Sequence, residues 1–296
     1  MAPAQKARQA GHLHIQEPMS RHTSWRVGGP AAELYIPVGL EDLAVFVRNR
    51  TAPQPSPVWI GLGSNILVRD RGIAGSVILT TGLKHWQVDA DTVYAEAGVP
   101  TARVARAAAE AGLSGAEFLA GIPGTVGGAL AMNAGAFGGE TWAIVQEVQT
   151  MDPAGTLRWR PAAEFEATYR TVRMPAQEWF VGARFRLAPE PVSQLARARI
   201  RELLAHRGAT QPTQWPNGGS VFRNPPGDHA ARLIEATGLK GLRRGGACIS
   251  TLHANFIVND ADATAADIEY LIDLIRQRVL DLHGVTLDTE VQVLGE

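Results

Sequence analysis

The sequence predicts an α+β fold, in which short strands and helices follow one another without regular alternation. Short apolar runs lie between glycines and prolines, which is typical of strands in mixed sheets. Apolar residues spaced three and four apart, the helical pattern, occur in only a few segments between those runs. Hydrophobic residues make up 45% of the chain and charged residues 19%, so the chain can bury a sizeable core. A regularly wound parallel sheet would alternate strands and helices along the whole chain, and this sequence does not.

The first half of the chain is predicted to contain two helices among several strands. Residues 1–20 are polar and are expected to form a flexible arm. The first helix covers residues 40–50, where Leu43, Phe46 and Val47 share a face, and the second begins at Pro100. The predicted strands are residues 33–37, 58–60, 77–79 and 86–96.

The second half is predicted to contain two longer helices. The first covers residues 192–206 and ends at Gly208. The second covers residues 264–282, with a capping box formed by Thr264 and Asp267 and a stop at Gly284. The predicted strands are residues 145–151, 179–187 and 285–294, the last of which contains Glu290.

These elements suggest an arm and three units. Pro189 and Pro191 mark the clearest boundary, since proline interrupts regular structure. The expected division is an arm at 1–20, a first lobe at 21–82, a second lobe at 83–188 and a C-terminal domain at 189–296.

Composition excludes several classes of protein. The formal net charge of -1 offers no broad basic field for nucleic acid or anionic lipid. A single cysteine, Cys248, excludes an internal disulfide framework and a cysteine-rich zinc site. No secretory signal and no apolar run long enough for a bilayer are visible. We therefore expect a cytoplasmic protein with no metal, no nucleic-acid partner and no membrane insertion.

Glycine is the one residue type in excess, and its placement suggests ligand binding. The chain has 31 glycines, against a usual share of about 7%, and nine of them lie between Gly112 and Gly139. The first glycine motif is Gly61-Leu62-Gly63-Ser64-Asn65, directly after a predicted strand. Its backbone amides could approach an anion closely, although a simple tight turn explains this pentapeptide equally well. It matches neither the dinucleotide fingerprint nor the P-loop.

Two further glycine motifs follow. Residues 121–140 hold paired glycines, a proline and small side chains, a density that a simple turn does not need. With the first motif they suggest two phosphate-binding loops and hence a dinucleotide. Residues 216–225 place Ser220 after two glycines, which leaves its hydroxyl unobstructed, although such a serine is more often part of a turn. No Gly-x-Ser-x-Gly elbow surrounds it, so a hydrolase nucleophile is not indicated.

Taken together and in order, these motifs closely resemble a known enzyme family. The resemblance is to the UDP-N-acetylenolpyruvoylglucosamine reductases, the flavoenzymes of bacterial peptidoglycan synthesis. It covers almost everything from His22 to Glu290, and the short spacing from Arg170 to Ser220 is similar to the shorter of the family's two subtypes. The matching segments are residues 22–31, 61–65, 121–140, 169–170, 219–225 and 253–259.

The resemblance implies a cofactor and a fold. The fold would be a two-part FAD-binding domain of the vanillyl-alcohol-oxidase (PCMH) type, followed by a C-terminal α+β substrate-binding domain. FAD would be bound tightly but not covalently, NADPH would be the reductant, the substrate would be a UDP-sugar, and the protein would be a monomer. The cofactor-binding residues it implies are Gly61, Gly63, Ser64, Asn65, Ile66, Gly121, Ile122, Pro123, Gly124, Thr125, Gly127, Gly128 and Asn133.

The resemblance also implies a catalytic set, Arg170, Ser220 and Glu290. An enolpyruvyl ether resists hydride addition unless negative charge can flow into its carboxylate. Arg170 suits that carboxylate because its guanidinium is always charged and forked. A protonated Glu290 could donate to the same group, and Ser220 could give a proton to the adjacent carbon. The implied substrate contacts are Tyr169, Arg207, Gln211, Gly219, Arg223, Asn224 and His253.

The chain departs from the family pattern at two positions. Val172 stands where the family often has serine, and Arg223 stands where lysine commonly precedes the Asn-Pro pair. The expected activity is the FAD- and NADPH-dependent reduction of UDP-N-acetylglucosamine enolpyruvate to UDP-N-acetylmuramate. Two alternatives remain open at this point: a flavin oxidase of the same fold with another substrate, and a non-catalytic protein that binds nucleotide sugars.

Overall fold

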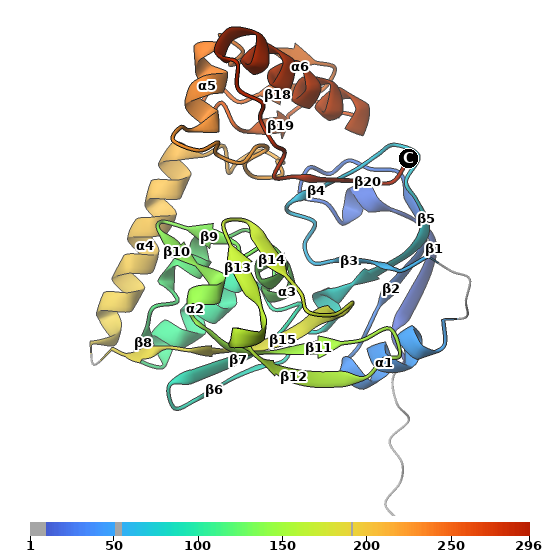
Figure 1. Ribbon diagram of the computed structural model, residues 1–296, viewed down its shortest axis with the longest axis vertical. Helices are drawn as coiled ribbons and strands as arrows, with labels where there is room; N and C mark the ends of the chain where they lie inside the picture. Colours follow the sequence, from blue (N-terminus) through green and yellow to red (C-terminus); the bar gives the residue numbers. More distant parts are fainter. Residues whose placement is uncertain (1–9, 51–54, 191) are drawn as a thin grey trace, which may run out of the picture.

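The computed structural model describes residues 10–50, 55–190 and 192–296, which pack as two lobes and a third unit (Figure 1). The first lobe is a four-stranded sheet in the order β1-β2-β5-β3. Strands β2 and β3 both pair with β5 in parallel, with Leu34 opposite Val77. Helix α1 covers Leu40–Arg48, as the apolar spacing predicted. The strands are β1 (His12–Pro18), β2 (Pro30–Ile36), β3 (Val58–Ile60), β4 (Ile66–Val68) and β5 (Ile73–Leu79).

The prediction of a flexible arm at residues 1–20 is wrong for residues 10–20, the part of it that the structure describes. Residues 12–18 form β1, which pairs antiparallel with β2 along its whole length, and Met19 beyond it is fully buried. The side chains of β1 are mostly exposed, including Leu13 and Ile15, so the strand buries no apolar face although these two residues alternate with His12 and His14. Residues 1–9 lie outside the described part.

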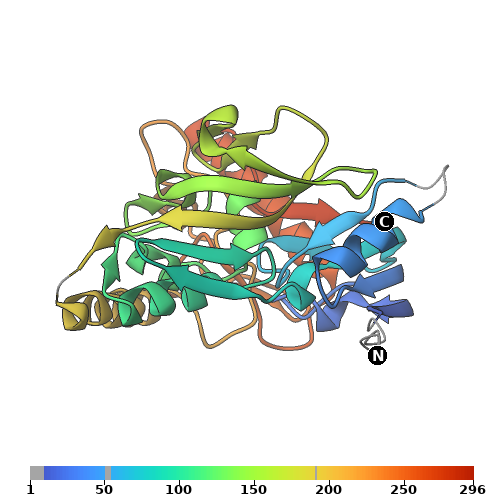
Figure 2. The same cartoon turned by 90° about the horizontal axis from the view of Figure 1, so that it is seen from below.

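The second lobe is built on a five-stranded antiparallel sheet in the order β12-β11-β15-β7-β6. Figure 2 shows these strands side by side from below. Helices α2 (Thr101–Glu110) and α3 (Val126–Ala131) pack with this lobe, and their buried residues belong to one core with those of the sheet. The strands are β6 (Trp86–Asp89), β7 (Thr92–Glu96), β11 (Val145–Met151), β12 (Leu157–Pro161) and β15 (Trp179–Arg186).

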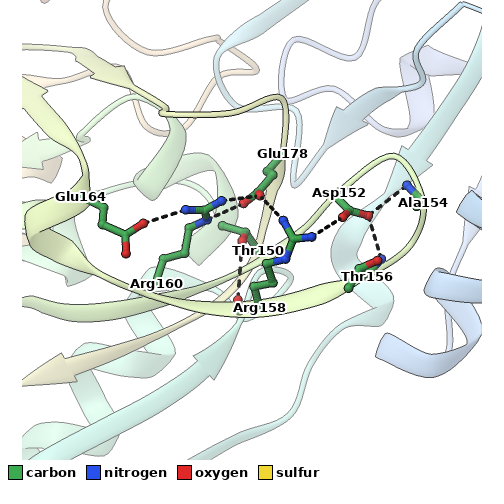
Figure 3. A network of polar contacts seen from close by, with 8 residues as sticks. All are labelled: Thr150, Asp152, Ala154, Thr156, Arg158, Arg160, Glu164 and Glu178. Carbon is green, nitrogen blue, oxygen red and sulfur yellow. Dashed lines mark hydrogen bonds and ion pairs between the residues drawn. The ribbon is translucent and has the colours of Figure 1, made fainter.

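A charged network fixes the edge of this sheet (Figure 3). The Arg160 guanidinium donates to both carboxylate oxygens of Glu178, at 2.7 and 2.8 Å. Arg158 lies 3.3 Å from the same carboxylate and 3.2 Å from Asp152, which also accepts from the backbone amides of its own turn. The Glu178 side chain is only 3% exposed, and the Arg160 hydrogen bond holds the pKa of its carboxyl below the ordinary value. The network therefore ties β12 to the start of β15.

Helix α4 (Ser193–Thr210) runs along the second lobe toward the third unit (Figure 1). Ala196 and Ile200 are buried in the second-lobe core, and the helix packs against α2. The expected domain boundary at 189 is therefore displaced, because most of α4 belongs to the second lobe. Pro191 lies outside the described residues. The helix continues through Gly208 to Thr210.

The third unit packs helix α6 (Ala265–His283) and helix α5 (Ala230–Ala236) on a small antiparallel sheet. The predicted capping box of Thr264 and Asp267 is present, and Gly284 ends α6 in the left-handed conformation. Asp70 of the first lobe also caps α6, since its carboxylate accepts from the amides of Ala265 and Ala266. The strands are β17 (Arg243–Arg244), β18 (Ala247–Ile249) and β19 (Ile257–Asn259).

The predicted strand at 285–294 is much shorter in the structure. Only Gln292–Leu294 form a strand, β20, and it leaves the third unit to pair in parallel with β4 of the first lobe. Glu290 lies just before it. No helix in the described ranges is long and apolar enough to cross a membrane. The remaining short elements are β8 (Leu113–Ser114), β9 (Gly135–Ala136), β10 (Gly139–Glu140), β13 (Glu166–Thr168), β14 (Thr171–Arg173), β16 (Ala188–Pro189), η1 (Met19–Arg21), η2 (Thr80–Gly82), η3 (Glu117–Gly121), η4 (Thr141–Ala143) and η5 (Ala162–Glu164).

Candidate active site

The two lobes and the third unit enclose a cavity of about 810 Å³. Most residues that the glycine motifs singled out line it. The lining residues from the expected cofactor set are Gly61, Gly63, Ser64, Asn65, Ile66, Gly121, Ile122, Pro123, Gly124, Thr125 and Gly128. Those from the expected catalytic and substrate sets are Arg170, Arg207, Gln211, Gly219, Ser220, His253 and Glu290.

The first two glycine motifs meet in one wall of the cavity. A Cβ on Gly61 would lie 2.2 Å from the Thr125 hydroxyl, so any larger residue would force the Thr125 side chain to move. The Ser64 hydroxyl donates to the carbonyl of Pro123 and joins the loops directly. The Thr125 hydroxyl is buried and has no hydrogen-bond partner. A glycine-lined wall with an unpaired hydroxyl fits a cofactor that carries phosphates, and these residues are suited to hold FAD.

Two residues of the expected cofactor set lie elsewhere. Gly127 packs against Ala97 of the second lobe, and its amide donates to the Ala97 carbonyl. It lines a smaller cavity of about 170 Å³. Asn133 is buried, and its side chain binds Glu140 and the carbonyl of Thr168. Both residues support the cavity wall rather than line it.

Arg170 lies on the turn between β13 and β14 and reaches into the cavity. Its φ is +55°, a conformation that non-glycine residues rarely adopt. Its terminal nitrogens donate to the carbonyls of Gly135, at 3.0 Å, and Asn133, at 3.5 Å. Each of those nitrogens has a second N–H, so the guanidinium can still donate to a carboxylate.

Glu290 lies next to Arg170 in the lining of the cavity. Its Oε1 lies 3.0 Å from Arg170 Nε, close enough for an ion pair. The angle at the Nε–H is too poor for a hydrogen bond. Burial raises the pKa of the Glu290 carboxyl, while the charges of Arg170 and Arg223 oppose that rise. The Asn65 side chain donates to the Glu290 carbonyl at 3.1 Å and so connects this residue to the first glycine motif.

Ser220 lies on a loop held by two asparagines. Asn217 Oδ1 accepts from the amide of Gly219, whose φ is +77°. Asn255 binds both the amide and the carbonyl of Phe222, at 2.9 and 2.8 Å. The half-buried Ser220 lines the cavity with Arg170 and Glu290, so residues from three separate segments meet in one site.

The expected substrate contacts divide into two groups. Arg207 lines the cavity at the end of α4 and donates to Gln211 at 3.1 Å, and burial lowers the pKa of its guanidinium. His253 also lines it, and burial lowers the pKa of its imidazole, which favours the neutral form. The expected contacts that lie outside the lining are Tyr169, Arg223 and Asn224.

Those outside the lining have other contacts. The Asn224 side chain accepts from the amide of Ala230 and caps α5. The Tyr169 ring lies 5.4 Å from the Arg170 guanidinium and is largely exposed. Val172, a departure from the family pattern, packs against the second-lobe core, where an apolar side chain suits the site.

Several lining residues were not expected. His206 and Thr210 flank Arg207 on α4, and Thr210 lies three residues beyond it, a spacing that places both on one helix face. Phe137 comes from the second glycine motif, and His229 precedes α5. Within the described ranges, no three His, Cys, Asp or Glu side chains lie close enough together to hold a metal ion.

Known proteins are similar to this chain over its whole length. It matches the FAD binding domain family over residues 34–160 and the UDP-N-acetylenolpyruvoylglucosamine reductase C-terminal domain over residues 211–294. The reductase of Alkalilimnicola ehrlichii is 56% identical, with 100% of this chain and 99% of that protein covered. The reductase of Methylococcus capsulatus is 57% identical, with 95% and 92% covered.

A solved structure agrees. The crystal structure of the reductase from Thermus caldophilus matches with a TM-score of 0.81 at 33% identity, covering 96% of this chain and 99% of that one. The expected fold, an α+β FAD-binding domain followed by a C-terminal domain, is confirmed. With relatives above half identity over nearly its entire length, the chain belongs to the UDP-N-acetylenolpyruvoylglucosamine reductase family.

Proposed function

We propose that this protein uses NADPH and FAD to reduce the enolpyruvyl group of UDP-N-acetylglucosamine enolpyruvate, giving UDP-N-acetylmuramate for peptidoglycan. The observation that carries the proposal is the convergence of Arg170, Ser220 and Glu290 on the cavity that the glycine loops line. FAD, when bound, supplies the redox chemistry by taking a hydride from NADPH and giving it to the substrate carbon.

Arg170 binds the substrate carboxylate in this proposal. Its fixed charge and two free N–H groups stabilise negative charge as it moves into that carboxylate. Glu290, with its raised pKa, retains a proton more readily than an exposed glutamate and can donate to the same group. The Arg170 side chain is 19% exposed and that of Glu290 is 10% exposed, so water screens these charges little.

Ser220 gives a proton to the carbon next to that carboxylate. Its hydroxyl forms no hydrogen bond to another described residue, so it is free to turn toward a substrate. The asparagine contacts around it hold the loop, which keeps the hydroxyl at one place in the cavity. A positioned proton donor of this kind contributes roughly 100- to 10,000-fold in rate.

Arg207 is the proposed anion contact for the rest of the UDP-sugar. It lines the same cavity, and no carboxylate pairs with it among the described residues. Gln211, Gly219 and His253 line the same cavity and would also contact the substrate. We place the protein in the cytoplasm, acting as a monomer on small molecules, with no nucleic-acid partner.

A single anaerobic titration tests the proposal. NADPH should bleach the visible absorbance of the bound flavin, and the enolpyruvyl sugar nucleotide should restore it. Flavin that is bleached but recovers only with oxygen would point to an oxidase with another substrate. A purified protein that neither carries FAD nor takes it up would indicate a non-catalytic binding protein.

A further inference from the structure

The turn that carries Arg170 is strained and has little support of its own. Strands β13 and β14 have three residues each and, within the part of the chain that the structure describes, pair only with one another. Arg170 occupies the third position of the Thr168–Thr171 turn with a φ of +55°, where glycine or asparagine is favoured. A strained backbone of this kind persists only when its surroundings hold it.

Arg223 supplies contacts that hold this turn. Its Nη2 donates to the Arg170 carbonyl at 3.2 Å, and its Nη1 lies 3.4 Å from the Thr171 hydroxyl. The two donors therefore reach the strained residue and the one after it. The contact joins positions that are 53 residues apart, from the third unit to the second lobe.

Apart from the effect of its charge on Glu290, the surroundings of Arg223 offer no other role for an arginine. Its Nε is buried without a partner, and no carboxylate among the described residues forms an ion pair with it. It does not line the cavity, so the geometry does not favour direct contact with the substrate. Its backbone belongs to the loop that carries Ser220, three residues earlier, and its amide donates to the Asp288 carbonyl, close to Glu290.

We propose that Arg223 is a positioning residue, which holds the Arg170 turn in its left-handed conformation and fixes that turn relative to the Ser220 loop. The expected effect on the rate rests on the proposed function. The effect on the conformation of the turn does not, because hydrogen exchange measures it without turnover. Arg223 thereby sets the distance between the carboxylate-binding guanidinium and the proton donor. A misplacement of about 1 Å between such groups can cost roughly 100-fold in rate.

Arg223 also acts on Glu290 through its charge. Its positive charge lowers the pKa of the Glu290 carboxyl, together with that of Arg170, against the effect of burial. Removal of the Arg223 charge should therefore raise the pH at which Glu290 loses its proton. Lysine keeps the charge but can make only one of the two oxygen contacts.

Two variants and a matched control separate these effects. Arg223→Met removes both the charge and the contacts, and Arg223→Lys keeps the charge. Arg173→Met is the control, because Arg173 lies on the same hairpin but is 79% exposed and, among the described residues, forms an ion pair only with Glu166. Each holoenzyme is studied by stopped-flow measurement of flavin reduction by NADPH and of reoxidation by the enolpyruvyl substrate, and by hydrogen exchange of residues 166–173.

In Arg223→Met we expect normal flavin reduction, reoxidation slowed roughly 10- to 100-fold, and faster hydrogen exchange across the turn. The pKa seen in the pH profile of reoxidation should rise. Arg223→Lys should restore that pKa and part of the rate, and Arg173→Met should match the wild type throughout. Reoxidation or exchange in Arg223→Met equal to that of the control would overturn the proposal.

Other outcomes are equally decisive. If both half-reactions slow together, or if both Arg223 variants lose FAD, Arg223 is a folding residue and the positioning role is wrong. If the wild type itself is not reoxidised by the substrate, the proposed function fails. Hydrogen exchange still decides the role of Arg223 in that case, because it reports the turn directly.

Discussion

Replacement of Arg170 by lysine tests the idea that a forked guanidinium, and not only a positive charge, is required in the cavity. Arg170 makes three contacts: 3.0 Å to Glu290, 3.0 Å to the carbonyl of Gly135 and 3.5 Å to that of Asn133. A lysine ammonium is a single donor group on a flexible stem and can replace one of them.

The expected magnitude follows from the bond to the substrate carboxylate that lysine cannot make, because an ammonium cannot reproduce both bonds of the fork. One charge-assisted hydrogen bond in a partly buried site is worth up to about 3 kcal/mol, and this bond strengthens as negative charge moves into the carboxylate. Since about 1.4 kcal/mol corresponds to a tenfold change in rate, reoxidation of the flavin by substrate should slow roughly 100-fold. Reduction by NADPH does not use the substrate carboxylate, so we expect that step to stay within about twofold of the wild type.

Stopped-flow absorbance under anaerobic conditions measures the two half-reactions separately. Arg173→Lys makes the same chemical change at an exposed position of the same hairpin and serves as the control. If the flavin of Arg170→Lys is reoxidised at the wild-type rate, the reasoning is refuted, because a positive charge alone would then suffice. Equal slowing of both half-reactions would mean that the substitution disturbs the flavin and not the substrate carboxylate.

Three further predictions follow from the same structure. Ser220→Ala should leave flavin bleaching by NADPH intact and slow reoxidation by roughly 100- to 10,000-fold, as measured in the same instrument. Gly61→Ala should weaken FAD binding, seen as loss of flavin on gel filtration, because the added Cβ would lie 2.2 Å from the Thr125 hydroxyl. Glu178→Gln should lower the free energy of unfolding in urea at neutral pH. The deficit should vanish as the pH falls well below the ordinary glutamate pKa of 4.5, since the lowered pKa of Glu178 stabilises the fold only while the carboxyl is ionised.

Controls make these predictions specific. Gly208→Ala is the matched change for Gly61→Ala, because nothing lies within 4 Å of a Cβ at Gly208. FAD retention equal in both variants would contradict the account of the glycine wall. Equal slowing of both half-reactions in Ser220→Ala would assign Ser220 to binding or folding. A stability deficit in Glu178→Gln that does not depend on pH would show that the ion pairs of Figure 3 are not its cause.

Local sequence signals predicted part of the fold well. Helix α6 begins at a capping box and ends at a left-handed glycine, and both signals lie within the helix or next to it. Strand β1 was missed because pairing with β2, and not burial of an apolar face, makes it a strand. The boundary at 189 was misplaced because prolines mark interruptions of the chain, whereas the packing of α4 on the second lobe depends on the fold.

The candidate site shows the same division. The glycine wall was visible in the sequence because close approach of two loops demands glycine at particular positions. The position of His206 in the cavity lining could not be predicted from the sequence, since packing decides which face of α4 is turned to the cavity. The contact of Arg223 with Arg170 was not visible either, because residues 53 positions apart are joined only by the folded chain.

The pairing of β20 with β4 has a consequence for the order in which the chain is synthesised. Gln292 donates its backbone amide to the carbonyl of Asn65, so β20 supports the loop that carries the first glycine motif. A ribosome makes Asn65 long before it makes Gln292. The cofactor wall therefore gains this support only after residue 292 has been translated, and a nascent chain stalled before residue 290 should bind flavin poorly even though its glycine loops are already present.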